Sequence, residues 1–166
     1  DATGITAIAD ALRVNGALAS LNLSGNDIGS ISGYRHQSAV ATGIKAIGEA
    51  LRVNGVLMSL DLQENRVGAE GATAIAQALK VNGAMTDLNL CYNDDITGEA
   101  AQLLAQAVLG SASLEVFGEV PIKELRADTL TELDLIGKDV MFMPHLDVAP
   151  DGKGVRDVVD GWISDF

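Results

Sequence analysis

The chain has 166 residues and a formal net charge of −12 at pH 7, because 11 Lys and Arg stand against 23 Asp and Glu. This acidity disfavours nucleic acid and anionic membranes as partners, since both would repel the protein. The one cysteine, Cys91, excludes an internal disulfide, and no apolar run approaches the ~20 residues of a membrane-spanning helix. With no signal segment at its start, the chain is predicted to be cytoplasmic. Because it begins with Asp1 rather than Met, we expect a fragment or a processed form.

Three nearly identical segments recur along the chain and predict helices. They are GITAIADALRVNG at 4–16, GIKAIGEALRVNG at 43–55 and GATAIAQALKVNG at 71–83, and a weaker fourth copy begins at Gly98. In the first copy Ile5, Ile8 and Leu12 recur at helical spacing, and the other copies keep a similar apolar pattern. Each copy therefore predicts one short amphipathic helix.

A strand is predicted after each of the first three helices. In the segments LASLNLSGND, LMSLDLQENR and MTDLNLCYND, the residues that flank the inner Leu alternate as they do along a strand. The strand centres, Leu21, Leu60 and Leu88, are separated by 39 and then 28 residues, and Phe117 is the next candidate. The underlying period is 28 residues, and each unit is one strand plus one helix.

These residues resemble the leucine-rich repeats of the ribonuclease-inhibitor-like subclass, which have 28-residue L-x-x-L-x-L-x-x-N units with a helix in every repeat. The resemblance covers residues 4–112 closely and the LTELDLIGKDV stretch from Leu130 loosely. Similar repeats occur in nucleotide-binding innate-immune receptors and in Ran GTPase-activating protein. The resemblance implies an α/β fold: a curved, horseshoe-shaped solenoid with a parallel sheet on its concave face and helices on its convex face.

Stacked units are expected to bury one continuous core, because a lone strand and helix cannot cover their own apolar faces. Two leucine ladders are predicted, one of Leu21, Leu60, Leu88 and Leu133 and the next of Leu23, Leu62, Leu90 and Leu135. Asn26, Asn65 and Asn93 stand just beyond the strands, where an amide can bond backbone groups that a sharp turn leaves unpaired. We predict a structural role for these asparagines and not a binding site.

The repeat pattern is broken once by an insertion, residues 30–42, which accounts for the longer first spacing. The insertion contains Tyr34 and Arg35, and insertions on solenoids often mark a binding edge. The alternative is a tolerated surface loop, since each doubling of a loop's length costs only ~0.6 kcal/mol.

The pattern decays after residue 113. A strand is still predicted at Phe117, but no helix is expected after it, and residues 121–129 are expected to form a short connector to another strand near Leu133. The solenoid is predicted to span residues 1–140 in about four to five units. Residues 141–166 form a tail that either covers the end of the solenoid as a cap or is disordered.

The sequence predicts neither a catalytic nor a metal site. Cys91, His36 and His145 belong to different units or lie outside them, which disfavours a nucleophilic pair of Cys and His. These three residues have no ligand spacing and are too few for a zinc site, and the glycines mark repeat boundaries rather than a phosphate-binding loop. We predict no enzyme activity, no metal and no cofactor.

The exposed strand positions are the predicted binding site, because their side chains point into the concave face. The candidates are Ser20, Asn22, Ser59, Asp61, Asp87, Asn89, Glu132 and Asp134, with Tyr34 and Arg35 of the insertion. Their polar, acidic character favours a basic protein as partner, although an acidic surface also serves solubility alone. We predict a non-enzymatic, monomeric module for protein–protein interaction. The resemblance leaves two alternatives, a regulator of a small GTPase and the ligand-sensing region of an immune-type receptor.

Overall fold

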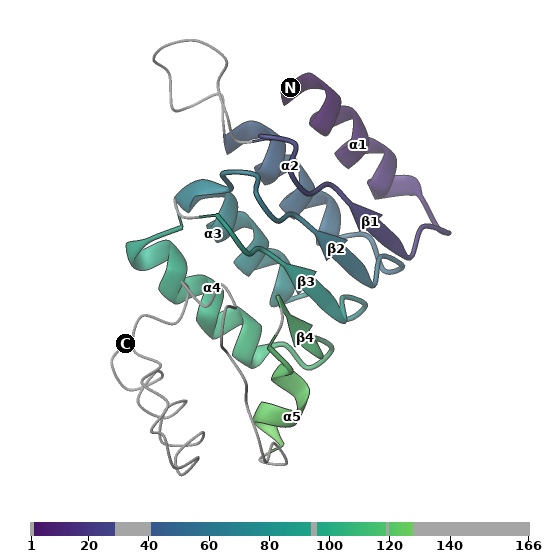
Figure 1. The fold of residues 1–166 in the computed structure, drawn as a ribbon. Helices are drawn as coiled ribbons and strands as arrows, with labels where there is room; N and C mark the ends of the chain where they lie inside the picture. Colours follow the sequence, from purple (N-terminus) through teal and green to yellow (C-terminus); the bar gives the residue numbers. More distant parts are fainter. Residues whose placement is uncertain (1, 29–40, 94–95, 119, 128–166) are drawn as a thin grey trace.

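The structure is a computed structural model that describes residues 2–28, 41–93, 96–118 and 120–127. Helices and short strands alternate along the chain, and the first four helices lie side by side on one side of the sheet (Figure 1). The elements are α1 (Ala2–Val14), β1 (Ser20–Asn22), α2 (Ala41–Leu51), β2 (Ser59–Asp61), α3 (Gly68–Leu79), β3 (Asp87–Asn89), α4 (Gly98–Gly110), β4 (Val116–Phe117) and α5 (Ile122–Arg126). This alternation confirms the predicted α/β solenoid.

The four strands form one parallel sheet in the order β1-β2-β3-β4. Leu21 pairs with Leu60, Leu60 with Leu88, and Leu88 with Phe117, so the register follows the predicted strand centres. The 39-residue first spacing does not shift the register, because the extra residues precede α2 and leave the strands in step. Side chains alternate along a strand, so this central row faces the helices while the rows beside it face away from them.

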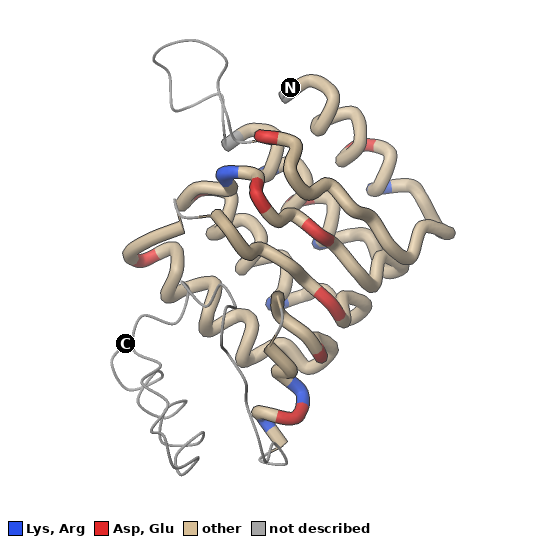
Figure 2. The backbone as a smooth tube through the Cα atoms, viewed as in Figure 1, with Lys and Arg blue, Asp and Glu red and all other residues tan. Residues whose placement is uncertain are grey.

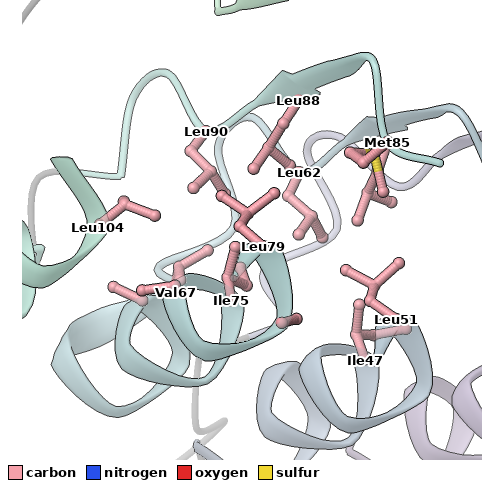
Figure 3. Packing of buried hydrophobic residues seen from close by; sticks show 14 of the residues in the cluster. Ile47, Leu51, Leu62, Val67, Ile75, Leu79, Met85, Leu88, Leu90 and Leu104 are labelled. Carbon is pink, nitrogen blue, oxygen red and sulfur yellow. The ribbon is translucent and has the colours of Figure 1, made fainter. Parts of the chain in front are cut away.

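The hydrophobic core lies between the sheet and the helices. Figure 3 shows Leu62, Leu88 and Leu90 of the strand layer above Ile75 and Leu79 of α3. These five side chains are buried, with exposures of 0 to 3%. Each such residue contributes ~1.5–3 kcal/mol of transfer free energy. This continuous core, rather than the intrinsic stability of any short helix, holds the units together.

Both predicted leucine ladders are continuous across the first three strands. Leu60 and Leu88 are buried, whereas Leu21 at the edge of the sheet is only partly buried. Phe117 of β4 takes the fourth place in this ladder, through its pairing with Leu88. Leu133 and Leu135 lie outside the described residues, so their predicted places in the ladders stay predictions.

Asn26, Asn65 and Asn93 bind the backbone of the turns after the strands, which confirms their predicted structural role. Asn65 donates from Nδ2 to the carbonyl oxygen of Leu23 in the preceding unit at 2.8 Å, and its Oδ1 accepts from the backbone N–H of Asn26 at 3.1 Å. Asn93 makes the corresponding contacts with the unit before it. Because Asn65 and Asn93 are buried, the loss of either amide would leave several backbone groups without partners.

A second row of asparagines, which sequence reasoning missed, follows the helices at Asn15, Asn54 and Asn82. Asn54 donates from Nδ2 to the carbonyl oxygens of Leu12 and Asn15 at 2.7 and 3.2 Å, and Asn82 does the same toward Leu51 and Asn54. Each Oδ1 accepts from the backbone N–H groups two and three residues later. Asparagine amides thus join neighbouring units along both edges of the solenoid.

Helices α2 and α3 approach each other closely at Gly48. A Cβ at this position would lie 2.9 Å from both the backbone carbon and the Cβ of Ala74. Real Cβ atoms do not come that close to backbone, so an alanine here would push the two helices apart. The missing methyl group of Gly48 therefore helps to set the spacing between these neighbouring helices, as does that of Gly71 in α3, where an added Cβ would lie 2.7 Å from Cγ2 of Ile44 in α2.

The segment after β4 differs from its prediction. We expected a connector without a helix, but the short helix α5 lies within it. Pro121 precedes α5 with a φ of −77°, which suits the start of a helix, and Ile122 is buried in the core. Before α5 the chain turns back, and Phe117 and Val120 exchange two backbone hydrogen bonds of 3.0 Å.

This turn and α5 cover the outer edge of β4. The backbone N–H of Lys123 donates to the carbonyl oxygen of Glu115 at 3.1 Å, and the guanidinium of Arg126 donates to the carbonyl oxygen of Leu114. Backbone groups at the edge of a sheet are otherwise open to pairing with another strand. Residues 120–126 therefore close this end of the sheet.

Two predicted regions lie largely outside the described residues. The described structure resumes after the insertion at Ala41, where α2 begins, so the last two residues of the predicted insertion 30–42 are helical. Residues 29–40 and the predicted tail 141–166 are not described, and the domain boundary at residue 140 stays a prediction.

Candidate functional site

The positions of β1, β2 and β3 whose side chains face away from the helices form two rows across the sheet, which we call the strand face. These side chains are exposed in β1 and half-buried in β2 and β3. The first row is Ser20, Ser59 and Asp87, and the second row is Asn22, Asp61 and Asn89. The parallel register thus brings together all the predicted site residues that the structure describes. The other predicted site residues, Glu132, Asp134, Tyr34 and Arg35, lie outside the described residues.

The second row of the strand face is held in place by hydrogen bonds. Asn22 donates from Nδ2 to Oδ2 of Asp61 across the strands at 3.2 Å. In Asn22, Asp61 and Asn89 the Oδ1 atom accepts from the backbone N–H two residues later, at 2.8, 2.9 and 3.0 Å. Asn89 also donates from Nδ2 to Oε1 of Gln63 at 3.1 Å. These side chains stabilise the turns after the strands, a role that the sequence analysis did not assign to them.

In the first row, Asp87 is the residue whose environment favours a positively charged partner. Partial burial raises the pKa of Asp87 above its ordinary value, the hydrogen bond with Ser59 lowers it, and the nearby charge of Asp61 raises it. Burial is the largest of these effects, so the pKa is raised overall. The protein thus stabilises this carboxylate less than water does, and a cation brought by a partner would stabilise it.

An exposed tyrosine borders the strand face and was absent from the sequence-based candidates. Tyr92 follows β3 and is 51% exposed. The corresponding residues in the preceding units are Gly25 and Glu64, and all three have φ between 55° and 65°. Aligning the repeats could have revealed Tyr92, because a bulky aromatic is uncommon where the left-handed backbone favours glycine.

Acidic residues lie along the strand layer, as Figure 2 shows. Asp61 and Asp87 belong to strands, and Glu64 lies in the turn after β2. Glu115, beside β4, forms an ion pair with Lys123 at 2.5 Å. Among the described residues no ion pair involves Asp61, Asp87 or Glu64. The negative charge of the strand face is therefore uncompensated by any described cation within ion-pair distance.

A groove on the helix side is the competing candidate. It lies across α2, α3 and α4, and its polar lining includes Lys45, Glu70, Thr73, Gln77 and Glu99. This lining mixes charges of both signs and contains no aromatic side chain. The strand face is the better candidate, because it combines charge of one sign with a bordering exposed aromatic residue.

The described residues hold no group of three or more His, Cys, Asp or Glu side chains that could bind a metal ion. Cys91 is buried beside Gly118, where an added Cβ would lie 2.9 Å from its Sγ atom. His36 and His145 lie outside the described residues. No helix in the described part of the chain is long and apolar enough to cross a membrane.

Comparison with known families agrees with this architecture. Residues 18–33 and 53–76 match the family model described as Leucine Rich repeat. The first segment contains β1, and the second contains β2 and most of α3. No curated protein matches the chain. The matched segments, together with the single parallel sheet and its alternating helices, support a leucine-rich repeat architecture for this part of the chain.

Proposed function

We propose that this protein is a non-enzymatic interaction module that binds a basic protein segment through the strand face. Leucine-rich repeats generally mediate protein–protein interaction. The observation that carries the finer proposal is the carboxylate of Asp87, which is partly buried in the face and has no ion-pair partner among the described residues.

The second row supports this proposal by making the face rigid. Asn22, Asp61 and Asn89 are fixed by bonds to neighbouring strands or turns. A preorganised surface loses little conformational entropy on binding, so more of the interaction energy appears as affinity. We therefore assign Ser59 and Asp87 to direct contact with the partner, and the second row mainly to positioning and to the negative potential.

Tyr92 supplies the aromatic anchor in this proposal. Tyrosine is enriched among the residues that carry most of the binding energy at protein interfaces, because one rigid side chain offers both apolar area and a hydroxyl. A Lys or Arg of the partner that binds Asp87 or Asp61 would also be attracted by the negative potential of the face, which speeds association at low salt.

The remaining features of the proposal come from the sequence. We include Glu132 and Asp134 as extensions of the acidic rows and Tyr34 and Arg35 as contacts at one edge. From the sequence we also propose that the protein is a monomer, that it is cytoplasmic and that its repeats are of the ribonuclease-inhibitor-like subclass. Regulation of a small GTPase and ligand sensing in an immune-type receptor have no supporting observation beyond the resemblance, so we do not propose them.

The test is a selection of Lys- and Arg-rich peptides from a displayed library on the immobilised chain, followed by measurement of Kd for the peptides obtained. Asp61→Asn combined with Asp87→Asn keeps the size of both side chains and removes two charges. We expect this pair of changes to raise Kd at least about tenfold, which corresponds to 1.4 kcal/mol. Tyr92→Ala is expected to raise Kd by a similar factor.

The matched control removes the same number of charges from the helix-side groove, with Glu70→Gln and Glu99→Gln. Both control residues are exposed and lie in the first turns of α3 and α4. The proposal requires that the control leave Kd nearly unchanged. A Kd that rises with the control and not with the strand-face variant would place the binding site in the groove instead.

A further inference from the structure

The connections that lead from each helix to the next strand lie together along one edge of the molecule (Figure 1). They share an edge because the strands are parallel and the helices between them run back. We call the first three connections, residues 13–19, 52–58 and 80–86, the helix-end edge. It has no residue in common with the strand face or with the helix-side groove.

Exposed apolar side chains are concentrated at the helix-end edge. Six large apolar residues of the described chain are exposed, and all except Tyr92 belong to this edge. These five are Val14, Leu18, Val53, Met58 and Val81. Val53, Met58 and Val81 belong to inner units, which have a described unit on each side. Single exposed apolar residues are ordinary, but apolar area that gathers on one part of a surface marks an interaction site.

The three valines hold the same position in successive units, directly after each helix. Val14, Val53 and Val81 are 87, 65 and 62% exposed. The backbone N–H of Val53 donates to the carbonyl oxygen of Ala50 at 3.1 Å, and that of Val81 makes the corresponding bond at 3.0 Å. The asparagine that follows Val53 or Val81 joins its unit to the unit before it. The valines therefore stand on a fixed backbone to which their side chains contribute no burial, and a preorganised surface loses little entropy on binding.

The charge of the helix-end edge is opposite to that of the chain. Its residues include Arg13, Arg52 and Lys80 but no Asp or Glu, although the chain contains 23 acidic residues. Arg13 forms ion pairs with Glu49 at 3.1 Å and with Asp10 at 3.7 Å. Arg52 and Lys80 are exposed, and neither forms an ion pair with another described residue. The edge thus carries positive charge that the described part of the protein does not balance.

Helix dipoles explain only part of this pattern. The C-terminal end of a helix favours a cation, which accounts for the sign of the charge at Arg52 and Lys80. The dipole gives no reason for an exposed valine beside each cation. Apolar area next to unpaired cations is instead what a partner with apolar and acidic side chains would complement.

The fourth unit marks the limit of this surface. Leu109 and Gly110 stand there in place of Lys80 and Val81. Glu115, at the end of the same connection, is paired with Lys123. The exposed valines and the free positive charge are therefore confined to the first three units.

We propose that the helix-end edge is a second docking surface, which binds an acidic protein segment with exposed apolar side chains. The valines make the apolar contact, and Arg52 and Lys80 pair with the acidic groups. An anionic membrane offers the same charge, but it would face and repel much of a chain whose net charge is −12, whereas a protein segment meets the edge alone. With the strand face, this edge would let the protein join two partners of opposite charge.

The test is a selection on the immobilised chain from a displayed library of peptides composed of Asp, Glu, Leu and Phe. Kd is then measured by fluorescence anisotropy with synthetic copies of the peptides obtained. Val53→Ser combined with Val81→Ser removes apolar contact, and Arg52→Gln combined with Lys80→Gln removes two charges. We expect each pair of changes to raise Kd at least about fivefold. Because all four side chains are exposed, thermal unfolding should remain cooperative in both variants.

Two controls separate contact at this edge from general effects of charge. Lys45→Gln combined with Arg66→Gln removes two cations from exposed positions outside the edge and should leave Kd nearly unchanged. Asp61→Asn combined with Asp87→Asn, the strand-face variant, should not raise Kd for the acidic peptide. The two docking surfaces can therefore fail independently of each other.

The proposal would be overturned if no library peptide bound more tightly than about 1 mM. An equal rise in Kd with the Lys45 and Arg66 control would also contradict it. Two further results would give the edge another role, provided that the valine variant abolishes them. Binding to vesicles of phosphatidylcholine and phosphatidylserine would assign the edge to a membrane, and self-association in sedimentation would assign it to a second copy of the chain.

Discussion

The outer edge of β4 is covered by a turn and α5, whereas the outer edge of β1 has no covering element among the described residues. The asparagine rows differ in the same way. In the fourth unit the place of Asn82 is taken by Ser111, and a weaker contact of 3.4 Å runs from Ser113 to the Asn82 carbonyl. In the first unit the asparagine itself is present, as Asn15, although no described unit precedes it.

The two ends of the sheet therefore differ in how closely their sequences follow the repeat. At the β4 end the sequence departs from the repeat, and the departure brings a proline, a short helix and two cations to the sheet edge. At the β1 end the sequence keeps the repeat. The change of sequence after Phe117 therefore has a structural role. It provides hydrogen-bond partners for backbone groups at the edge of β4 that another repeat unit would otherwise bind.

The largest expected effect is that of a charge placed in the central leucine ladder. Leu60→Asp buries a carboxylate without a partner at a site that is 1% exposed. Its expected cost of ~5 kcal/mol or more is comparable to the whole stability of a typical domain, so we expect no cooperative thermal transition.

Leu21→Asp makes the same change at the edge of the sheet, so its effect can be compared directly with that of Leu60→Asp inside the sheet. Leu21 is only partly buried, so the carboxylate can reach water and the variant should still melt cooperatively, at a lower Tm. Equal damage from the two variants, measured by circular dichroism during heating, would show that the first unit is not an open end.

The next effect concerns the covered end. Arg126→Met keeps the aliphatic length of the side chain but removes the donor to the Leu114 carbonyl oxygen. We expect a loss of ~1 kcal/mol and a fall in Tm of ~2–4 °C, with faster hydrogen exchange at the Lys123 N–H. The matched control is Arg52→Met, at an exposed position near the end of α2. Unchanged exchange at Lys123 would contradict the capping role of Arg126.

The smallest effect is a pH dependence within the first row of the strand face. Because the folded pKa of Asp87 is raised, the unfolded chain releases this proton at lower pH than the folded chain. Ionisation of Asp87 therefore lowers stability as pH rises from its ordinary pKa of 3.8 through the folded pKa. Asp87→Asn removes this effect.

We expect Asp87→Asn to raise the free energy of unfolding at pH 7 by no more than ~0.5 kcal/mol, since the site is largely solvated. At pH 3 the variant is expected to match the original chain. Ser20→Asn, in the same row at the open end, is the control and should show no such pH dependence. A difference between Asp87→Asn and the original chain that persists at pH 3 would point to packing rather than charge.

The sequence was sufficient for those parts of the fold that repeat. Leu21, Leu60 and Leu88 could be placed in one row because burial selects the same residue type once per unit. Asn65 could be assigned a structural role for the same reason. The row of Asn15, Asn54 and Asn82 was missed because an Asn-Gly pair at this point is typical of the end of a helix. The bonds of Asn54 to the preceding unit appear only once the units are stacked.

The parts that do not repeat were harder to predict. α5 was missed because no other unit supplies a pattern for it, and its residues act through single contacts to the edge of β4. In the candidate site, alternation along the strands was enough to place Asp61 and Asp87 on one face. It could not show that Asp61 is engaged by Asn22 while Asp87 is partly desolvated, since both depend on distances between units.

The contact of Gly48 with Ala74 has a consequence for the curvature of the molecule. Neighbouring strands in a sheet lie ~4.8 Å apart, whereas packed helices usually lie ~8–10 Å apart. A layer of helices is therefore longer than the layer of strands that it covers, and the stack bends toward the strands. By letting α2 and α3 approach, Gly48 reduces the bend between these two units. The radius of the strand face, and so the size of the surface that it can enclose, is tuned by a residue on the opposite side of the protein.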